Sequence, residues 1–145
     1  MTRVGAIAGK YLNISQIQPT VSKEPTMTDE SSVTEAVIRN HLQAFVEQKG
    51  IAAILDDYDE NARIYSEARV YDGRREICDF FVEFIGTLPT AAIERFALRS
   101  LRVDGRIAYI TWSAGDDIPF GTDTFVVNDG KIVSQTFAMC SRQPS

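Results

Sequence analysis

Cysteine and histidine are scarce in this sequence of 145 residues, which contains two cysteines and one histidine. Cys78 and Cys140 lie far apart without a CxxC spacing, a pattern that favours two reduced thiols over a disulfide. We therefore expect a reducing compartment, the cytoplasm. Because His41 stands alone and the sequence has no HExxH motif or Cys/His cluster, we expect no metal site and no cofactor.

Positive charge and long apolar runs are also lacking. The 15 lysine and arginine residues are outnumbered by 20 aspartate and glutamate residues, and no basic cluster alternates with aromatic residues. We therefore expect no nucleic-acid partner. No run approaches the roughly 20 apolar residues that a membrane-spanning helix needs. The apolar run Val4–Ala8 is shorter than the about 7–15 residues of a signal-peptide core, so we expect neither membrane insertion nor export.

The composition changes near residue 28. Residues 1–28 are rich in serine, threonine, glutamine and proline without a sustained period, which predicts a disordered or loosely attached tail. Residues 29–141 are expected to form a single domain, followed by a short tail at 142–145. The stretch Met27-Thr28-Asp29-Glu30 is typical of a protein start, which gives the hypothesis that residues 1–26 are not part of the natural product.

The first half of the expected domain has helical periodicity. Ser32 and Glu35 have the spacing of a capping box and predict the start of a helix whose apolar stripe includes His41 and which ends at Gly50. A short amphipathic segment follows from residue 51. After the Asp72-Gly73 turn, a third helix is predicted that ends at Gly86 and Pro89; its apolar stripe consists of Ile77, Phe80, Phe81, Phe84 and Ile85.

The second half has strand periodicity. Short extended segments at 62–66 and 70–71 precede four longer predicted strands, at 92–103, 106–114, 118–128 and 131–139. Helices followed by an antiparallel meander indicate the α+β class, with the helices buried on one face of a twisted sheet. The hollow between a curled sheet and its helices is a natural site for a small ligand.

One carboxylate interrupts the predicted hairpin GTDTFVVNDGKIVSQTF, residues 121–137. Asn128-Asp129-Gly130 is a tight-turn signal, and the period of two places Asp123 on the same strand face as Phe125. A carboxylate among apolar neighbours has three explanations. It is hydrogen-bonded to a partner, it is kept there to transfer a proton, or its assignment to the interior is wrong. Threonine hydroxyls at 122 and 124 or an arginine from a helix are the alternative partners.

Three segments together resemble the nuclear transport factor 2-like superfamily: LDDYDENARIYS at 55–66, YDGRREI at 71–77, and the hairpin at 121–137. Within it, the chain is most similar to the SnoaL-like polyketide cyclase and ketosteroid isomerase-like branch. The resemblance implies a cone of curved antiparallel sheet packed against three helices of the N-terminal half, and a homodimer formed through the sheet.

The isomerase pattern transfers only in part. Asp123 matches the acid that donates to a substrate oxyanion, and His41 stands where the isomerase has a tyrosine. The isomerase's general base falls on Ser66, with Glu67 one residue beyond and therefore on the opposite face. The resemblance thus implies that the base of steroid isomerisation is missing, whereas the polyketide cyclases need only a pocket aspartate.

These considerations predict a hydrophobic pocket for a small carbonyl compound, with cofactor-free acid/base chemistry of the isomerase, cyclase or dehydratase type. Asp123 and His41 are the expected catalytic residues. The expected substrate-binding residues are Tyr65, Ser66, Phe81, Trp112 and Phe137. The alternatives are a non-catalytic small-molecule binder that uses the same cone and a module that binds other proteins through the outer sheet face. For the residues themselves, the structural alternatives are that His41 is a buried histidine satisfied by a neighbour and that the aromatic residues are core.

Overall fold

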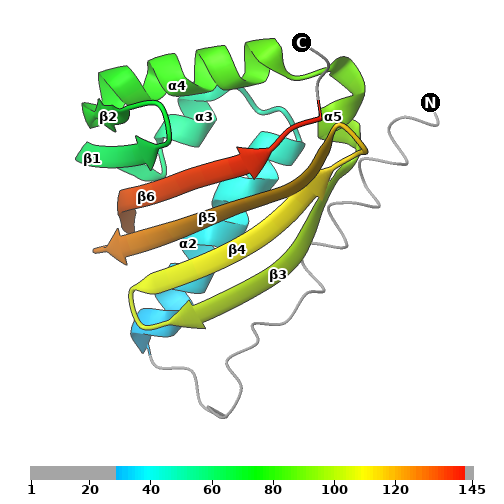
Figure 1. Ribbon diagram of the computed structural model, residues 1–145. Helices are drawn as coiled ribbons and strands as arrows, with labels where there is room; N and C mark the ends of the chain where they lie inside the picture. The colour runs from blue at the N-terminus through cyan, green and yellow to red at the C-terminus, as the bar shows by residue number, and fades with distance from the viewer. Residues whose placement is uncertain (1–28, 143–145) are drawn as a thin grey trace.

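The computed structural model describes residues 29–142, which form a curved six-stranded sheet with helices on its concave face (Figure 1). The strand order is β2-β1-β6-β5-β4-β3. The elements in chain order are α2 (Asp29–Val46), α3 (Ile51–Leu55), β1 (Tyr58–Ser66), β2 (Val70–Asp72), α4 (Gly73–Thr87), α5 (Thr90–Glu94), β3 (Phe96–Asp104), β4 (Ile107–Ala114), β5 (Ile118–Asn128) and β6 (Lys131–Cys140). The predicted α+β class is confirmed, whereas the predicted tail at residues 1–28 and the hypothesis of a start at Met27 lie outside the described residues.

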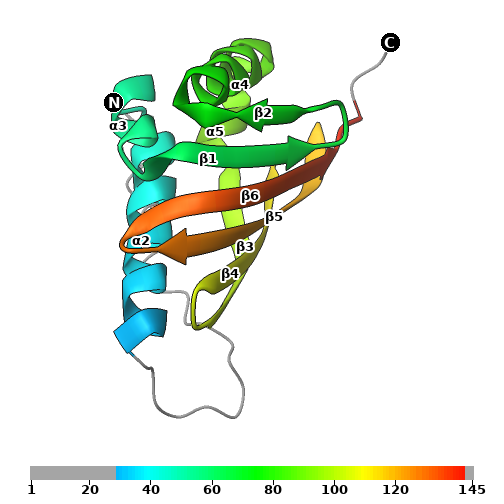
Figure 2. The ribbon, with the colours of Figure 1, turned by 90° about the vertical axis from the view of Figure 1, so that its left-hand side faces the viewer.

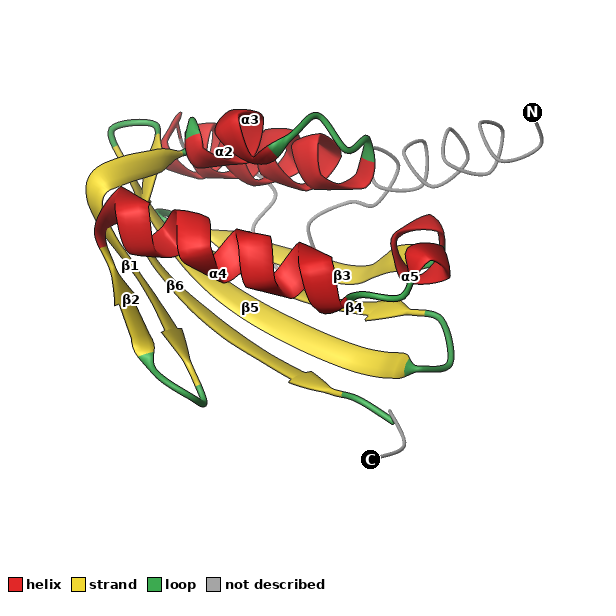
Figure 3. Ribbon diagram, turned by 90° about the horizontal axis from the view of Figure 1, so that it is seen from above, coloured by secondary structure: helices red, strands yellow, loops and turns green. Residues whose placement is uncertain are grey.

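The two long helices lie over different parts of the sheet. Figure 2 shows α2 running along one side of the curved sheet, and Figure 3 shows α4 lying across its concave face. Contacts place α2 against β3, β4 and β5, and α4 against β1 and β2. The pocket described below lies where both helices face the sheet. No helix within residues 29–142 is long and apolar enough to cross a membrane.

Helix α2 begins at Asp29, three residues before the start that the capping-box spacing predicts. The small polar residues of its first turns serve tertiary contacts: Ser31 Oγ accepts a hydrogen bond from the Gly105 backbone N–H at 2.9 Å, and Thr34 Oγ1 donates to the Gly105 carbonyl at 2.7 Å. These bonds tie α2 to the β3–β4 turn. Its apolar stripe, which includes Ile38 and Leu42, is buried against the sheet, as expected.

Helix α5 is the main error in the predicted elements. The sequence predicts a strand from residue 92, but Thr90–Glu94 is helical and β3 begins at Phe96. Pro89 precedes this short helix, and the Arg95 N–H closes it by bonding to the Ala91 carbonyl at 3.0 Å. The small apolar residues of this segment fit a buried helical turn as well as a strand, so the period alone could not separate the two.

The hairpin of β5 and β6 forms as predicted. Asp129 and Gly130 both have positive φ, 53° and 76°, as a tight hairpin turn requires. Along β5 the inward side chains alternate, and Asp123 and Phe125 are both buried on the concave face. One pairing differs from an antiparallel meander, because β1 runs parallel to β6. Strand β1 also begins at Tyr58, four residues earlier than predicted, which brings the tyrosine into the core.

Candidate functional site

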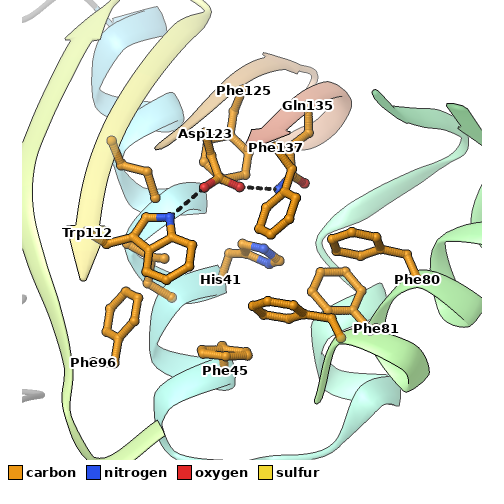
Figure 4. A pocket seen from close by; sticks show the side chains of 13 residues that line it. His41, Phe45, Phe80, Phe81, Phe96, Trp112, Asp123, Phe125, Gln135 and Phe137 are labelled. Atoms are coloured by element: carbon orange, nitrogen blue, oxygen red, sulfur yellow. Dashed lines mark hydrogen bonds between the residues drawn. The ribbon is translucent and has the colours of Figure 1, made fainter. Parts of the chain in front are cut away.

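A pocket lies between α2, α4 and the concave face of the sheet (Figure 4). Eight of its lining residues are phenylalanine or tryptophan: Phe45, Phe80, Phe81, Phe84, Phe96, Trp112, Phe125 and Phe137. Leu42 and Ile110 add aliphatic surface. The remaining lining residues, His41, Asp123 and Gln135, are polar. Such a composition, mostly aromatic with a few convergent polar groups, is typical of a small-molecule site.

The pocket is small. The space that the centres of water molecules can occupy in it is about 50 Å³. An engineered cavity of about 150 Å³ is large enough to bind benzene, so a ligand of one small ring requires the phenyl rings of this pocket to move apart.

Asp123 is held by two hydrogen bonds, one to each carboxylate oxygen. Trp112 Nε1 donates to Oδ1 at 2.7 Å, and Gln135 Nε2 donates to Oδ2 at 2.7 Å. The donors come from the neighbouring strands β4 and β6, so the sheet itself fixes the direction of the carboxylate. Neither threonine hydroxyl nor a helix arginine is its partner, which answers the question that the sequence leaves open.

Gly121 leaves room for the Trp112 indole beside Asp123. Trp112 pairs with Gly121 across β4 and β5, and the indole ring lies directly over the glycine. A Cβ atom at residue 121 would be 2.2 Å from Trp112 Cε2, far inside van der Waals contact. Only glycine at this position lets the indole N–H reach Asp123.

Burial raises the pKa of Asp123 from its ordinary value of 3.8 to about 6. The hydrogen bonds from Trp112 and Gln135 and the charge of His41 act in the opposite direction, because they favour the carboxylate. The loss of hydration is the larger effect. The result is a carboxyl group whose pKa lies close to neutral pH, where a group exchanges protons most effectively.

His41 does not contact Asp123. Its Nδ1 lies 3.4 Å from Asp57 Oδ2, and its Nε2 lies 3.3 Å from the Tyr58 hydroxyl oxygen. Both ring nitrogens therefore have protein partners, and the residue lines the pocket. Donation from His41 to a substrate oxygen stays a prediction, and it would require one of those contacts to break.

The structure brings five of the seven predicted site residues to the pocket: His41, Phe81, Trp112, Asp123 and Phe137. The other two predicted residues, Tyr65 and Ser66, are not part of the lining of this pocket. Tyr65 is 42% exposed and points away from the helices. Ser66 lies at the β1–β2 turn, where its Oγ donates to the Arg69 carbonyl at 2.9 Å. The alternation along β1 explains the position of Tyr65, since Ile64 occupies the inward position. Ser66 shares the face of Ile64 but lies at the end of the strand, outside the pocket lining.

Gln135 and Tyr58 are the polar site residues that the sequence analysis missed. Gln135 is on the same face of β6 as Phe137, so the period of two could have placed it beside Asp123. Tyr58 was hidden because it precedes the predicted first strand. Its hydroxyl is fully buried and donates to Gln135 Oε1. Among residues 29–142, no group of three or more potential ligands is placed to hold a metal ion.

Comparison with models of protein families gives no match, and neither does comparison with curated proteins. Solved structures do match. A nuclear transport factor 2-like protein of unknown function from Mesorhizobium loti is 23% identical, with a TM-score of 0.65 over 80% of this chain and 98% of that chain. A candidate ketosteroid isomerase from Kribbella flavida is 16% identical, with a TM-score of 0.60 over 80% of this chain and 84% of that chain.

A candidate polyketide cyclase from Sinorhizobium meliloti is also similar, at 16% identity and a TM-score of 0.59 over 71% of this chain and 94% of that chain. The chain therefore has the nuclear transport factor 2-like fold, and the resemblance in the sequence is confirmed at that level. At these identities the comparisons establish the fold and not the activity.

Proposed function

We propose that this protein binds a small hydrophobic carbonyl compound in the aromatic pocket and that Asp123 transfers a proton on it without a cofactor, in an isomerase, cyclase or dehydratase type of reaction. The observation that carries the proposal is the buried Asp123 carboxylate, held at both oxygens by Trp112 and Gln135 and facing an otherwise apolar pocket. Structural burial of a lone carboxylate is unfavourable, which favours a functional reason for it.

The ligand class follows from size and polarity. Phenyl rings line the pocket on five elements, α2, α4, β3, β5 and β6, so most ligand contacts are apolar. The volume of about 50 Å³ favours one ring over a steroid-sized ligand. A neutral ketone suits this site better than an anion, because the carboxylate of Asp123 would repel a second negative charge.

The proposed reaction begins with the carboxylate form of Asp123, which accepts a proton from the carbon next to the carbonyl group. The C–H electrons move into the new enolate, and the negative charge develops on the substrate oxygen. Gln135 supports that charge: its Nε2 has a second N–H, for which the described residues offer no acceptor. Protonated Asp123 then returns the proton to another carbon, which completes an isomerisation with no net change in atoms or electrons.

A non-catalytic binding role is the second candidate. Two features of the pocket favour it. Among the described residues that line the pocket, Asp123 is the one carboxylate, and both ring nitrogens of His41 contact other side chains. A binder needs the aromatic pocket but no proton transfer. The same ligand would then stabilise the fold without being changed.

The experiment uses cyclohex-3-enone, a single-ring ketone whose conversion to cyclohex-2-enone is followed by ultraviolet absorbance. The wild type is expected to catalyse the conversion, and Asp123→Asn to lose about 10²–10⁴-fold in rate. Undiminished turnover by Asp123→Asn would refute the role of Asp123. Thermal stabilisation by the ketone without turnover or exchange of its α-hydrogens into D₂O would favour the binding role.

We also propose a homodimer through the outer face of the sheet. The outward positions of β5 from 120 to 126 and of β6 from 134 to 140 carry no charged side chain, and neither do Tyr109 and Thr111 of β4. Phe120 and Tyr109 are exposed on this face. Sedimentation equilibrium is expected to give twice the chain mass, and Thr124→Glu to give a monomer because it buries a charge between the copies. A monomeric wild type would refute this assembly.

A further inference from the structure

A buried line of contacting side chains leads from Asp123 through Gln135 and Tyr58 to His41 and Asp57. Gln135 bonds to Asp123, the Tyr58 hydroxyl bonds to Gln135, His41 contacts Tyr58, and Asp57 contacts His41. All five residues are buried. They come from five separate parts of the chain: α2, the segment before β1, and strands β1, β5 and β6.

The direction of each bond follows from the donors and acceptors available. An ionised carboxylate only accepts, so Gln135 must turn its Nε2 toward Asp123, and its Oε1 then faces Tyr58. Burial, and to a lesser extent the carboxylates of Asp123 and Asp57, raises the pKa of Tyr58 well above its ordinary value, so the hydroxyl keeps its proton. That single proton is donated to Gln135.

The same logic fixes the state of His41. Since Tyr58 has donated its proton to Gln135, its oxygen faces His41 Nε2 as an acceptor, and Nε2 must carry a hydrogen. On the other side of the ring, Nδ1 faces a carboxylate oxygen of Asp57 at 3.4 Å. The second oxygen of Asp57 accepts a hydrogen bond from Asn40 Nδ2 at 3.0 Å, an arrangement that suits an ionised carboxylate. A hydrogen on Nδ1 would be donated to that carboxylate.

We propose that His41 is a positively charged positioning residue: paired with Asp57, it sets the one-way order of hydrogen bonds through Tyr58 and Gln135 and thereby holds Asp123 ready to accept a proton. The proposal rests on the proposed function, because it describes the support of the same carboxylate. It assigns His41 no contact with substrate oxygen. It also gives Asp57 and Tyr58, which the sequence analysis does not include among the expected site residues, a part in the site.

Among the described side chains that pack around Asp123, His41 is the one that can carry a positive charge. Helix α2 presents His41 and Asn40, β1 presents Tyr58, β6 presents Gln135, and the segment before β1 presents Asp57. The pocket-lining residues of α4 and β3 are phenylalanines. The charge of His41 lowers the pKa of Asp123 and so opposes the effect of burial. Without that charge, the carboxylate would be ionised over a narrower pH range.

The charge on His41 can be observed directly, because it is the single histidine of the sequence. In protein made without a histidine tag, a ¹H–¹⁵N spectrum that correlates ring carbon-bound protons with ring nitrogens reports one residue. At pH 7 both nitrogens are expected to have the shifts of protonated nitrogen. In Asp57→Asn, one of them is expected to lose its proton at that pH. A neutral ring in the wild type, or an unchanged ring in Asp57→Asn, would overturn the proposal.

The effect on Asp123 is measured by following its carboxyl ¹³C shift with pH in the absence of any ligand. His41→Gln is expected to move the midpoint upward. Ile38→Val, a buried change one turn earlier in α2 that removes a methyl group and no charge, is the matched control and is expected to leave the midpoint in place. An unmoved midpoint in folded His41→Gln would overturn the proposal. Because these measurements use no substrate, they stand whether or not the protein turns over an enone.

Discussion

The two walls of the pocket are built on opposite principles. The sheet wall holds its polar groups in fixed directions: Trp112 and Gln135 each donate to Asp123, and Gln135 is in turn held by Tyr58. The wall formed by α4 has no such constraint. It presents phenylalanine rings that contact one another edge-on or stacked, and none of them makes a hydrogen bond.

The difference indicates a division of labour. Hydrogen bonds are directional, so the sheet can hold a carboxylate in the geometry that proton transfer needs. Phenyl packing is less directional, and one ring can be exchanged for another apolar group at modest free-energy change. We therefore expect changes in the sheet wall to alter chemistry and stability, and changes in the α4 wall to alter the size of ligand that binds.

The largest expected effect is on the sheet wall, at Gly121. In Gly121→Ala the new Cβ would overlap the Trp112 indole at 2.2 Å, so the ring or the strand must move and the bond to Asp123 is lost. We expect the free energy of unfolding to fall by about 3 kcal/mol or more, measured by urea denaturation.

The matched control is Gly86→Ala on α4, where nothing lies within 4 Å of the new Cβ. This variant is expected to be more stable than the wild type by about 0.5–1 kcal/mol, because alanine favours the helix. Equal effects of the two substitutions would contradict the close packing of Trp112 over the sheet.

The next effect is the pH dependence that the buried Asp123 imposes. Its pKa is about 6 in the fold and 3.8 ordinarily, so between these values the folded state binds more protons than the unfolded state. Stability is therefore expected to fall as pH rises from 4 to 6, by up to about 3 kcal/mol from this group, and to change no further above that range. Asp123→Asn, measured by urea denaturation at each pH, is expected to lack this contribution.

The activity should follow the same ionisation in the opposite sense. If the carboxylate is the base, turnover of cyclohex-3-enone rises as pH passes about 6 and reaches a plateau above it. A rate that falls over this interval would mean that the protonated acid performs the chemistry.

The sequence predicts the strands and turn that carry this site better than it predicts the side-chain contacts within it. The alternation around Asp123 and Phe125 and the turn at Asn128-Asp129-Gly130 are local patterns, and the structure confirms both. Local patterns place a residue on a face of a strand. They therefore place Asp123 in the interior correctly, although they do not name the side chains that meet it there.

The polar network could not be predicted in the same way. The Tyr58 to Gln135 bond joins residues 77 positions apart, and it exists because β1 lies parallel to β6. That pairing has no local signature. By contrast, the outward position of Tyr65 follows from a local pattern, because an inward Ile64 in the same strand implies that its neighbour faces outward.

A smaller effect is expected on the α4 wall. Phe84→Leu removes part of a ring that stacks on Phe80, at 5.8 Å between centroids, and leaves the Asp123 network untouched. We expect a two-ring ketone such as 2-tetralone to bind about tenfold more tightly, measured by titration calorimetry, because the shorter side chain leaves room for more apolar contact. Val82→Ala, on the exposed side of the same helix, should leave the affinity unchanged.

The smallest effect compares two of the four aromatic residues that the sequence assigned to the pocket. Phe137 lines the pocket, whereas Tyr65 lies on the outer face of the neighbouring strand. We expect Phe137→Leu to weaken cyclohex-3-enone binding several-fold and Tyr65→Leu to change it by less than about twofold, because only the first loses contact with the ligand. The dissociation constants are measured by calorimetry. If both variants raise the dissociation constant equally, the ligand binds outside the pocket and the distinction between its two walls is lost.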